Sequence, residues 1–332
     1  MKYNLVLRSV VTNADSKSLL IDYLDKKYTY KNREYWQNKI ETGEILVNNC
    51  KAFSEYLLMP GDAVVYTILD YYEEDLDCSY KIEFENHNII VVSKPANLPV
   101  QATRRIYKQT LTQLLKADLN LPDIYPIHRL DRETGGLIVY LKNKFLTSPY
   151  KKEPIKILKE KYYLAVVRGI FEKEEEIIAI PLKEAADGIV NYKMVYDEKG
   201  KNAETHFYKL GDDGKSSLLL ARLMTGRKHQ IRAHAACLGF PILGDKLYSF
   251  ESKYFLKRCD DNLREGDLKV LGANNHLLHA YCLILDLEKK SEVKLFSDYF
   301  SAEMREVLDK MDSWETKAKN IIKLNEKLGI KK

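Results

Sequence analysis

The segment His128–Leu141, HRLDRETGGLIVYL, constrains the fold of this chain more than any other stretch. Its first half is charged, its second half is a run of apolar and β-branched residues, and Gly135-Gly136 lies between them. This pattern predicts a polar loop that leads into a buried strand. Charged loops at strand edges often carry function, and Asp131, placed between two arginines, would stay ionised and could act as a nucleophile or base. A solvated ion-pair cluster is the alternative interpretation.

Length and composition predict an ordinary protein with room for two domains. The chain has 332 residues, 45% of them hydrophobic, which is enough for a substantial core. Its 53 basic and 48 acidic residues give a net charge of +5, too small an excess to predict nucleic-acid binding by itself. The five cysteines lack metal-ligand spacing, so we expect no disulfide and no metal. Without a signal-peptide pattern or a membrane-length apolar run, the sequence predicts a cytoplasmic location and no membrane contact.

Residues 1–70 are expected to form a small module of their own. From Ser18 to about Leu69 the pattern predicts two short helices and then two strands, with a tight turn at Asn48-Asn49. The acidic stretch 71–79 lacks a clear period and is interpreted as a linker.

This module resembles an RNA-binding domain that a small-subunit ribosomal protein shares with tyrosyl-tRNA synthetase. The segments NREYWQNKIETGEILVNN and MPGD carry the resemblance. It implies RNA binding by a small α+β domain, with Lys31, Arg33 and Lys39 able to face phosphates from one side. A generic α+β interaction domain is the alternative.

Residues 80–300 are expected to form a second, mainly β domain, followed by a helical tail over 301–332 that ends in a frayed segment. A basic cluster that includes Arg104 and Arg105 could contact phosphates, or could be a solvated face. A helix is expected over 110–118. The segments rich in β-branched and aromatic residues that predict strands are 89–92, 161–169, 188–195, 203–210, 217–224 and 276–285.

A second cluster of chemically useful residues lies in TGRKHQIRAHAACLG, between Gly226 and Gly239, where we expect roughly three turns of helix. His229 and His234 are five positions apart, whereas two zinc-binding histidines on one helix need four, so we reject a metal site and expect His234 to be packed. Arg232 lies beside the buried stripe of this helix, where an unpaired guanidinium would be costly. It therefore needs a carboxylate partner, and Asp131 is the candidate.

These motifs together resemble the RluA-like family of pseudouridine synthases, isomerases that convert uridine to pseudouridine in RNA. The resemblance covers about Tyr80 to Leu287, and its further matches are SKPANLPV, KYYLAVVRG, GDKLY and LLHA. It implies an α+β fold in which a mixed, mainly antiparallel bent sheet carries a central catalytic cleft. It also accounts for a preceding RNA-binding module, which many members carry.

The resemblance assigns roles to individual residues. Asp131 matches the catalytic aspartate, Tyr163 the tyrosine that stacks on the target uracil, and Arg232 the arginine paired with the aspartate. The residues expected to contact RNA or to displace the target base are His128, Arg129, Arg227, Arg104, Arg105, Lys31, Arg33 and Lys39. The implied partner is rRNA or tRNA, the protein is expected to be a monomer, and no cofactor or metal is required because substrate and product are isomers.

Three features depart from the family. Gly135 stands where the family commonly has serine, the basic loop Arg104–Lys108 does not match a family signature, and residues 251–275 are diverged. Two other functions fit parts of the pattern. A noncatalytic RNA-binding or ribosome-assembly factor could keep the same fold. A glycosidase-like hydrolase would need two carboxylates around the scissile bond, whereas the HRLD segment supplies one that is framed by arginines.

Overall fold

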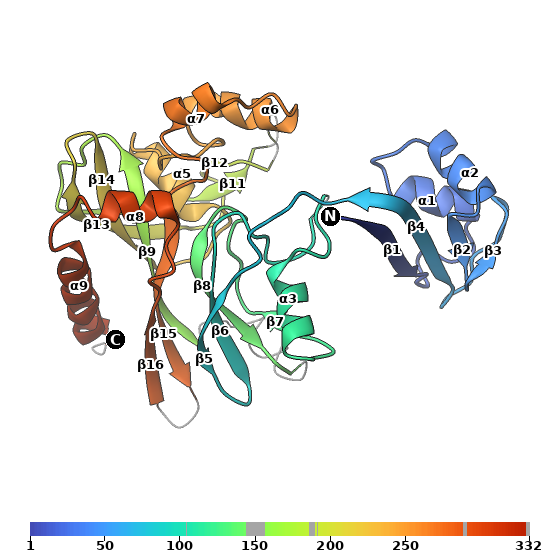
Figure 1. The fold of residues 1–332 in the computed structure, drawn as a ribbon, viewed down its shortest axis with the longest axis horizontal. Helices are drawn as coiled ribbons and strands as arrows, with labels where there is room; N and C mark the ends of the chain where they lie inside the picture. The colour runs from blue at the N-terminus through green and yellow to red at the C-terminus, as the bar shows by residue number, and fades with distance from the viewer. Residues whose placement is uncertain (104, 144–156, 186–189, 191, 288–290, 330–332) are drawn as a thin grey trace. The chain divides into compact units, whose positions relative to one another are not determined.

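The computed structural model describes residues 1–103, 105–143, 157–185, 190, 192–287 and 291–329. The chain divides into two compact units, an N-terminal unit of Met1–Asp75 and a large unit of Leu76–Lys332 (Figure 1). The division falls within the acidic stretch 71–79. The expected end of the module at residue 70 lies inside a strand that continues to Tyr72.

The N-terminal unit packs two helices on an antiparallel sheet with the order β1-β4-β2-β3. The sequence pattern missed strand β1, because only one of its nine residues, Leu5, is buried. Asn48 and Asn49 both have left-handed backbone angles (φ 53° and 65°), as a tight hairpin turn requires. The elements are β1 (Lys2–Val10), α1 (Leu20–Lys27), α2 (Arg33–Glu41), β2 (Ile45–Val47), β3 (Cys50–Lys51) and β4 (Ala63–Tyr72).

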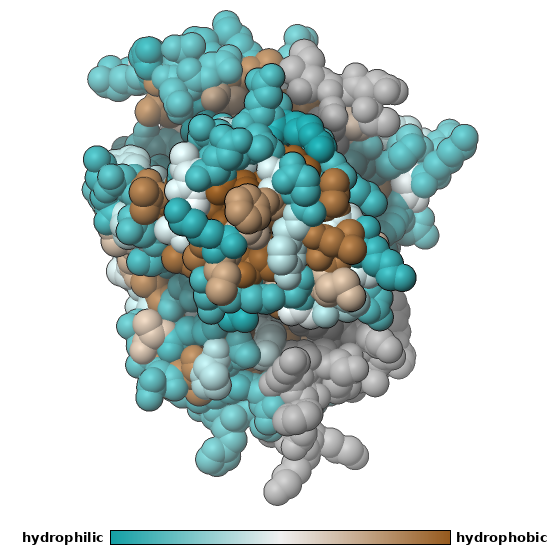
Figure 2. All heavy atoms as spheres, turned by 90° about the vertical axis from the view of Figure 1, so that its right-hand side faces the viewer, coloured by the Kyte–Doolittle hydropathy of each residue, from teal (hydrophilic) through white to brown (hydrophobic). Residues whose placement is uncertain are grey.

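Trp36 is the centre of the N-terminal core. It is fully buried, and four tyrosine rings lie with their centroids 5.1–5.7 Å from its own. The same unit also exposes large apolar side chains, among them Phe53, Leu57 and Met59. Figure 2 shows brown, apolar surface among teal, polar surface on the side of the molecule that it displays.

The large unit is built on one ten-stranded sheet, with the order β10-β13-β14-β9-β15-β8-β6-β5, β16 beside β15 and β7 beside β8. Among the pairings described, only that of β15 with β8 is parallel, so the sheet is mixed and mainly antiparallel, as expected. The strands are β5 (Lys81–Glu85), β6 (Ile89–Lys94), β7 (Tyr125–Pro126), β8 (Gly135–Leu141), β9 (Leu158–Arg168), β10 (Glu175–Ala179), β13 (Glu204–Asp212), β14 (Ser216–Leu223), β15 (Leu278–Leu287) and β16 (Ser291–Phe296), with a separate hairpin of β11 (Leu182–Glu184) and β12 (Met194–Tyr196).

Strand β8 is the apolar half of the HRLD segment, and all seven of its residues are buried. Its two glycines lie against β15. Gly136 has φ +95°, and a Cβ there would collide with the backbone of Ala280. A Cβ on Gly135 would stand 2.9 Å from the His279 ring nitrogen Nδ1, which accounts for glycine where the family commonly has serine. The close approach of the two strands places the loop before β8 at the centre of the sheet.

Strand β9 alternates between the two faces of the sheet. Tyr163 faces a core that includes Ile231 and Ala235 of α5, whereas Tyr162 faces a core with α8 and α9. The two tyrosines therefore point to opposite faces, as expected from the period of a strand. The helices of the large unit are α3 (Leu111–Asp118), α5 (Gln230–Cys237), α6 (Lys253–Cys259), α7 (Glu265–Leu271), α8 (Ala302–Leu308) and α9 (Trp314–Gly329), with a 3₁₀ turn at Phe250–Ser252.

The tail expected over 301–332 contains helices α8 and α9, which pack on the sheet, and its last residues, 330–332, lie outside the described part of the chain. Met304, Leu308 and Ile322 are at most 3% exposed and belong to the core on the Tyr162 side of the sheet. Of the expected strand over 188–195, residues 188, 189 and 191 lie outside the described residues, and only Met194 and Val195 are in a strand, β12. None of the helices in the described part of the chain has the length and apolar character needed to cross a membrane.

Candidate active site

Asp131 lies in the loop before β8, and its side chain is 27% exposed. The backbone N–H of Thr134 donates to the carbonyl oxygen of Asp131 (3.1 Å), which closes a turn that leads directly into the strand. The carboxylate is thus carried by a short, anchored loop at the start of a fully buried strand.

Helix α5 is shorter than expected, because Arg227–His229 form a turn instead of its first residues. His229 has a left-handed backbone (φ 53°), and the helix begins at Gln230. The buried Gln230 side chain accepts from Arg227 N (2.9 Å) and from the Thr225 hydroxyl (2.7 Å), and donates to Glu204 O (2.9 Å). These bonds hold the turn against β13, a role that the residue pattern did not indicate.

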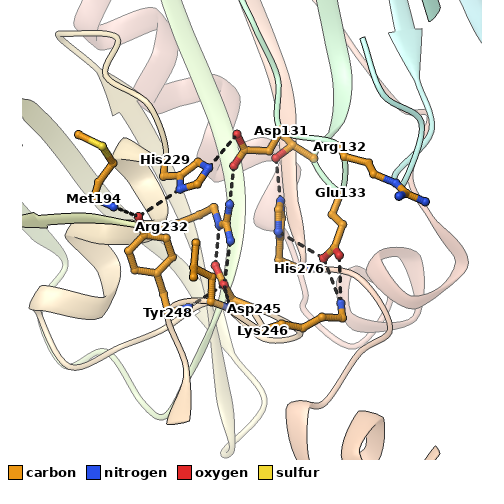
Figure 3. A network of polar contacts seen from close by, with 12 residues as sticks. Asp131, Arg132, Glu133, Met194, His229, Arg232, Asp245, Lys246, Tyr248 and His276 are labelled. Atoms are coloured by element: carbon orange, nitrogen blue, oxygen red, sulfur yellow. Dashed lines mark hydrogen bonds and ion pairs between the residues drawn. The ribbon is translucent and has the colours of Figure 1, made fainter. Parts of the chain in front are cut away.

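Arg232 joins two carboxylates (Figure 3). Its Nη1 donates to Asp131 Oδ2 (2.6 Å), and its Nε and Nη2 donate to the two oxygens of Asp245 (2.7 and 2.9 Å). Asp245 is fully buried and also accepts the backbone N–H groups of Leu247 and Tyr248. The structure therefore brings together the expected pair of Arg232 and Asp131, and adds Asp245. GDKLY matched the family motif, but no pattern gave its aspartate a role.

The Asp131 carboxyl is held ionised. Burial on its own raises its pKa, but attraction to Arg232, with smaller contributions from His229 and His276, outweighs burial and lowers the pKa to about 2. Burial likewise raises the pKa of Asp245, but the charge and hydrogen bonds of Arg232, together with His276 and the backbone N–H of Tyr248, hold it below its usual range. At neutral pH Asp131 is therefore an anion with one oxygen bound to Arg232 and the other free of that arginine.

His229 faces the other oxygen of Asp131, with its Nε2 3.7 Å from Oδ1. Its Nδ1 lies 3.2 Å from the Tyr248 hydroxyl, which itself accepts the backbone N–H of Met194 (2.9 Å). The Tyr248 hydroxyl can donate its proton to Nδ1, and neutral His229 would then carry its ring proton on Nε2, on the side of Asp131. Burial lowers the His229 pKa to about 4, so the ring is neutral at pH 7.

A second buried ion pair fastens the loop after Asp131. Glu133 accepts from Lys246 Nζ (3.1 and 3.2 Å), from the backbone N–H of His276 (3.2 Å) and from Arg258. Glu133 is only 6% exposed. Its partners come from the segments after α5, so the loop that carries Asp131 is attached both to β8 and to the diverged region 251–275.

Asp131 lies in a cleft of about 740 Å³, called here the main cleft. Tyr163 is on its wall and is 5% exposed. A neighbouring cavity of about 550 Å³ shares Asp131, His229 and Arg232 with it and extends toward Phe255 of α6. The walls of the main cleft carry six lysines and arginines against one carboxylate, Asp131. The six cations are Arg129, Lys159, Lys161, Arg227, Lys228 and Arg232.

The expected RNA-contacting residues have different surroundings in this cleft. Arg129 is exposed and has no hydrogen-bond or ion-pair partner in the part of the chain that the structure describes. Arg227 donates from Nε to Asn202 O (2.9 Å). His128 lines the cleft, but its Nε2 accepts the backbone N–H of Val139 (3.1 Å), so it also supports β8.

The remaining candidates lie away from the cleft or outside the described residues. Arg105 is exposed and lies 3.5 Å from Asp261, and Arg104 is outside the described residues. In the N-terminal unit, Lys31 lies over the Tyr35 ring (4.8 Å). Arg33 pairs with Asp22 (2.6 Å) and Lys39 with Glu44 (2.7 Å), so two of the three expected phosphate contacts have partners within the module.

In the described ranges, no group of three or more histidine, cysteine or acidic side chains is placed to hold a metal ion. The chemistry available from the residues present is that of one ionised carboxylate, oriented by Arg232, in a cationic cleft beside an aromatic ring.

Comparisons with known proteins agree on one family. Residues 88–237 match the family described as RNA pseudouridylate synthase. The chain is 32% identical over 232 residues to the mitochondrial tRNA pseudouridine(32) synthase of Saccharomyces cerevisiae, covering 69% of this chain and 50% of that one. It is 28% identical over 317 residues to the uncharacterized RNA pseudouridine synthase YlyB of Bacillus subtilis, covering 91% and 97%.

The chain thus spans half the length of the yeast relative and almost all of the bacterial one. Among solved structures, human RNA pseudouridylate synthase domain containing 4 has a TM-score of 0.53 at 24% identity, covering 69% of this chain and 92% of that one. At this identity the structural likeness supports the fold alone.

Proposed function

We propose, on the premise that this chain belongs to the RNA pseudouridylate synthase family, that it isomerises uridine to pseudouridine in structured rRNA or tRNA. Asp131 is the catalytic residue. The observation that carries this assignment is its carboxylate, which Arg232 holds ionised while the side chain stays 27% exposed in the main cleft.

The geometry supports a separate role for each of Tyr163, Arg129 and Asp131. A uridine must leave its helix or loop before a side chain can reach its glycosidic bond. Tyr163 offers an aromatic wall on which the displaced uracil can stack, and Arg129 is a cation at the cleft that has no partner among the described residues. Asp131 then acts as nucleophile or base while the bond from ribose to N1 breaks and a bond to C5 forms. The C5 hydrogen leaves as a proton, and N1 gains one.

The alternatives receive less support from the structure. A glycosidase would need a second usable carboxylate near Asp131. Glu133, two residues away, is buried and occupied by Lys246 and Arg258. A noncatalytic RNA-binding factor would have no need for a carboxylate held ionised in the cleft. The monomeric state and the cytoplasmic location expected from the sequence stay predictions, and one relative is named as mitochondrial.

Asp131→Asn tests the proposal. The amide is nearly isosteric but is neither a nucleophile nor a base, so tritium release from RNA labelled at C5 of uridine should be abolished while RNA affinity stays within a few-fold. Asp123→Asn is the matched control, because Asp123 is an exposed carboxylate of the same unit outside the cleft. Substantial turnover by purified Asp131→Asn would refute the assignment. Mapping pseudouridine in total RNA with and without the gene would identify the target.

A further inference from the structure

Strand β9 presents Lys161 to the main cleft on the same face as Tyr163, because the two residues are two positions apart. Lys159 also lines the cleft, although the pairing of β9 with β15 shifts register beside it. All three line the cleft. Lys159 donates to Glu292 (2.6 Å). Lys161, which is partly buried, has no carboxylate or hydrogen-bond partner among the residues that the structure describes.

An unpaired, partly buried ammonium group is costly in the free protein. Burial lowers the pKa of Lys161, which reports the same cost. The lysine nitrogen is nevertheless kept open toward the cleft by Gly226, where an added Cβ would stand only 3.2 Å from Nζ. A group that is charged, unpaired and open to a substrate cleft gains most when the substrate supplies an anion.

We propose that Lys161 binds a backbone phosphate of the RNA beside the target uridine and so holds that nucleotide against Tyr163. This inference rests on the proposed function, because it takes RNA as the occupant of the cleft. Phosphates are the anions that RNA offers, and contacts to them position a nucleic acid without reading its sequence. A neutral uracil carbonyl would compensate the charge of Lys161 less well than a full negative charge does.

The test compares Lys161→Met with Lys142→Met and Lys161→Arg. Lys142→Met is the matched control, since it removes a partly buried lysine of the same unit that is paired with Glu85 and lies outside the cleft. The probe is total RNA from a strain that lacks the gene, labelled with tritium at C5 of uridine. A phosphate contact is present in the bound ground state as well as in the transition state, so its loss raises KM and spares kcat.

We expect Lys161→Met to raise the apparent KM about tenfold, since a charge-assisted hydrogen bond of this kind is worth about that factor. Its kcat should stay within about twofold. The slope of log affinity against log salt should fall by about 0.7, the value for one phosphate contact of a single strand. Lys161→Arg should keep most of the affinity, and Lys142→Met should keep the wild-type KM.

The alkaline pH dependence provides an independent measurement. Lys161 loses its charge at a lower pH than an ordinary lysine, so wild-type KM should rise on the alkaline side, whereas Lys161→Arg stays charged and should not show that rise. Both proteins are measured on the same RNA, so the titration of uracil and of the other groups around the cleft affects the two KM profiles equally. Those groups are His128, Arg129, Asp131, Lys159, Tyr163, Arg227, Lys228, His229 and Arg232.

A loss of kcat in Lys161→Met with an unchanged salt slope would overturn the phosphate assignment, and so would identical alkaline profiles of wild type and Lys161→Arg. If Lys161→Met does not fold, the dependence of KM on pH in Lys161→Arg still tests the proposal. Failure of the proposed function would give a different result, because the Asp131→Asn protein would then retain turnover. The proposal for Lys161 is tested by RNA affinity. RNA binding by the Asp131→Asn protein, with and without Lys161→Met, measures that affinity without chemistry.

Discussion

Replacing Asp245 by asparagine should destabilise the large unit by about 3 kcal/mol. The fully buried Asp245 carboxylate accepts four hydrogen bonds, two from Arg232 (2.7 and 2.9 Å) and two from the backbone N–H groups of Leu247 and Tyr248 (2.9 Å each). Asparagine removes the charge and turns an N–H group toward the guanidinium. Breaking a buried ion pair costs about 3–5 kcal/mol. Because Arg232 still forms its ion pair with Asp131 in this variant, we expect the lower end of this range.

Thermal unfolding followed by circular dichroism measures this loss. For a unit of this length, 1 kcal/mol corresponds to about 2–4 °C in Tm, so Asp245→Asn should lower Tm by about 6–12 °C. Turnover should fall as well, because Arg232 would no longer be held in place, and a misplacement of about 1 Å in an active site can cost about 100-fold in rate.

Glu184→Gln is the control for this experiment. Glu184 also pairs with a cation, Lys228 (2.7 Å), but its side chain is 57% exposed, so the variant should unfold at the wild-type temperature. A Tm for Asp245→Asn within 2 °C of wild type, measured on a protein with wild-type turnover, would show that Asp245 does not hold Arg232, whatever the distances suggest.

Three further outcomes can be measured. Gly136→Ala should fail to give a stable large unit, because the new methyl would collide with the backbone of Ala280, and a wild-type Tm would contradict the close approach of β8 and β15. Acidification should weaken the fold. Burial lowers the His276 pKa to about 4, so between about pH 6.5 and pH 4 the unfolded chain is protonated at His276 while the folded chain is not. The free energy of unfolding should therefore be unaffected by His276 above pH 6.5 and should fall by about 3 kcal/mol as the pH is lowered to 4. Equal urea midpoints at pH 7 and pH 4.5 would exclude this effect. Deleting residues 1–75 should leave the large unit folded and lower the log–log salt slope of RNA binding by roughly two units, since Lys31, Arg33 and Lys39 would be lost, whereas equal slopes would point to a protein-binding role for the module.

Local patterns were sufficient to predict much of the architecture. The apolar run after Gly136 predicted β8, the paired asparagines predicted the turn at 48–49, and Thr110 caps α3 at the expected start of that helix. These features depend on residues that are neighbours along the chain, so periodicity and turn chemistry are enough to detect them. Strand β1 escaped because only Leu5 is buried and because Val6 and Val10 place apolar side chains on its exposed face, which obscures the alternation.

The candidate site is different, because its contacts join residues far apart in the sequence. The cost of burying Arg232 indicated that a carboxylate must approach it, and the motifs supplied Asp131, 101 residues away. Only the tertiary structure shows that Asp245 holds the same guanidinium and that the His229 ring lies between the Tyr248 hydroxyl and Asp131. It also distinguishes Lys159, which is paired with Glu292, from Lys161, which has no partner among the residues that the structure describes, although both are lysines of one strand. The sequence determines which side chains are present and which face they leave from, but whether a charge has a partner depends on which strands and loops fold against it.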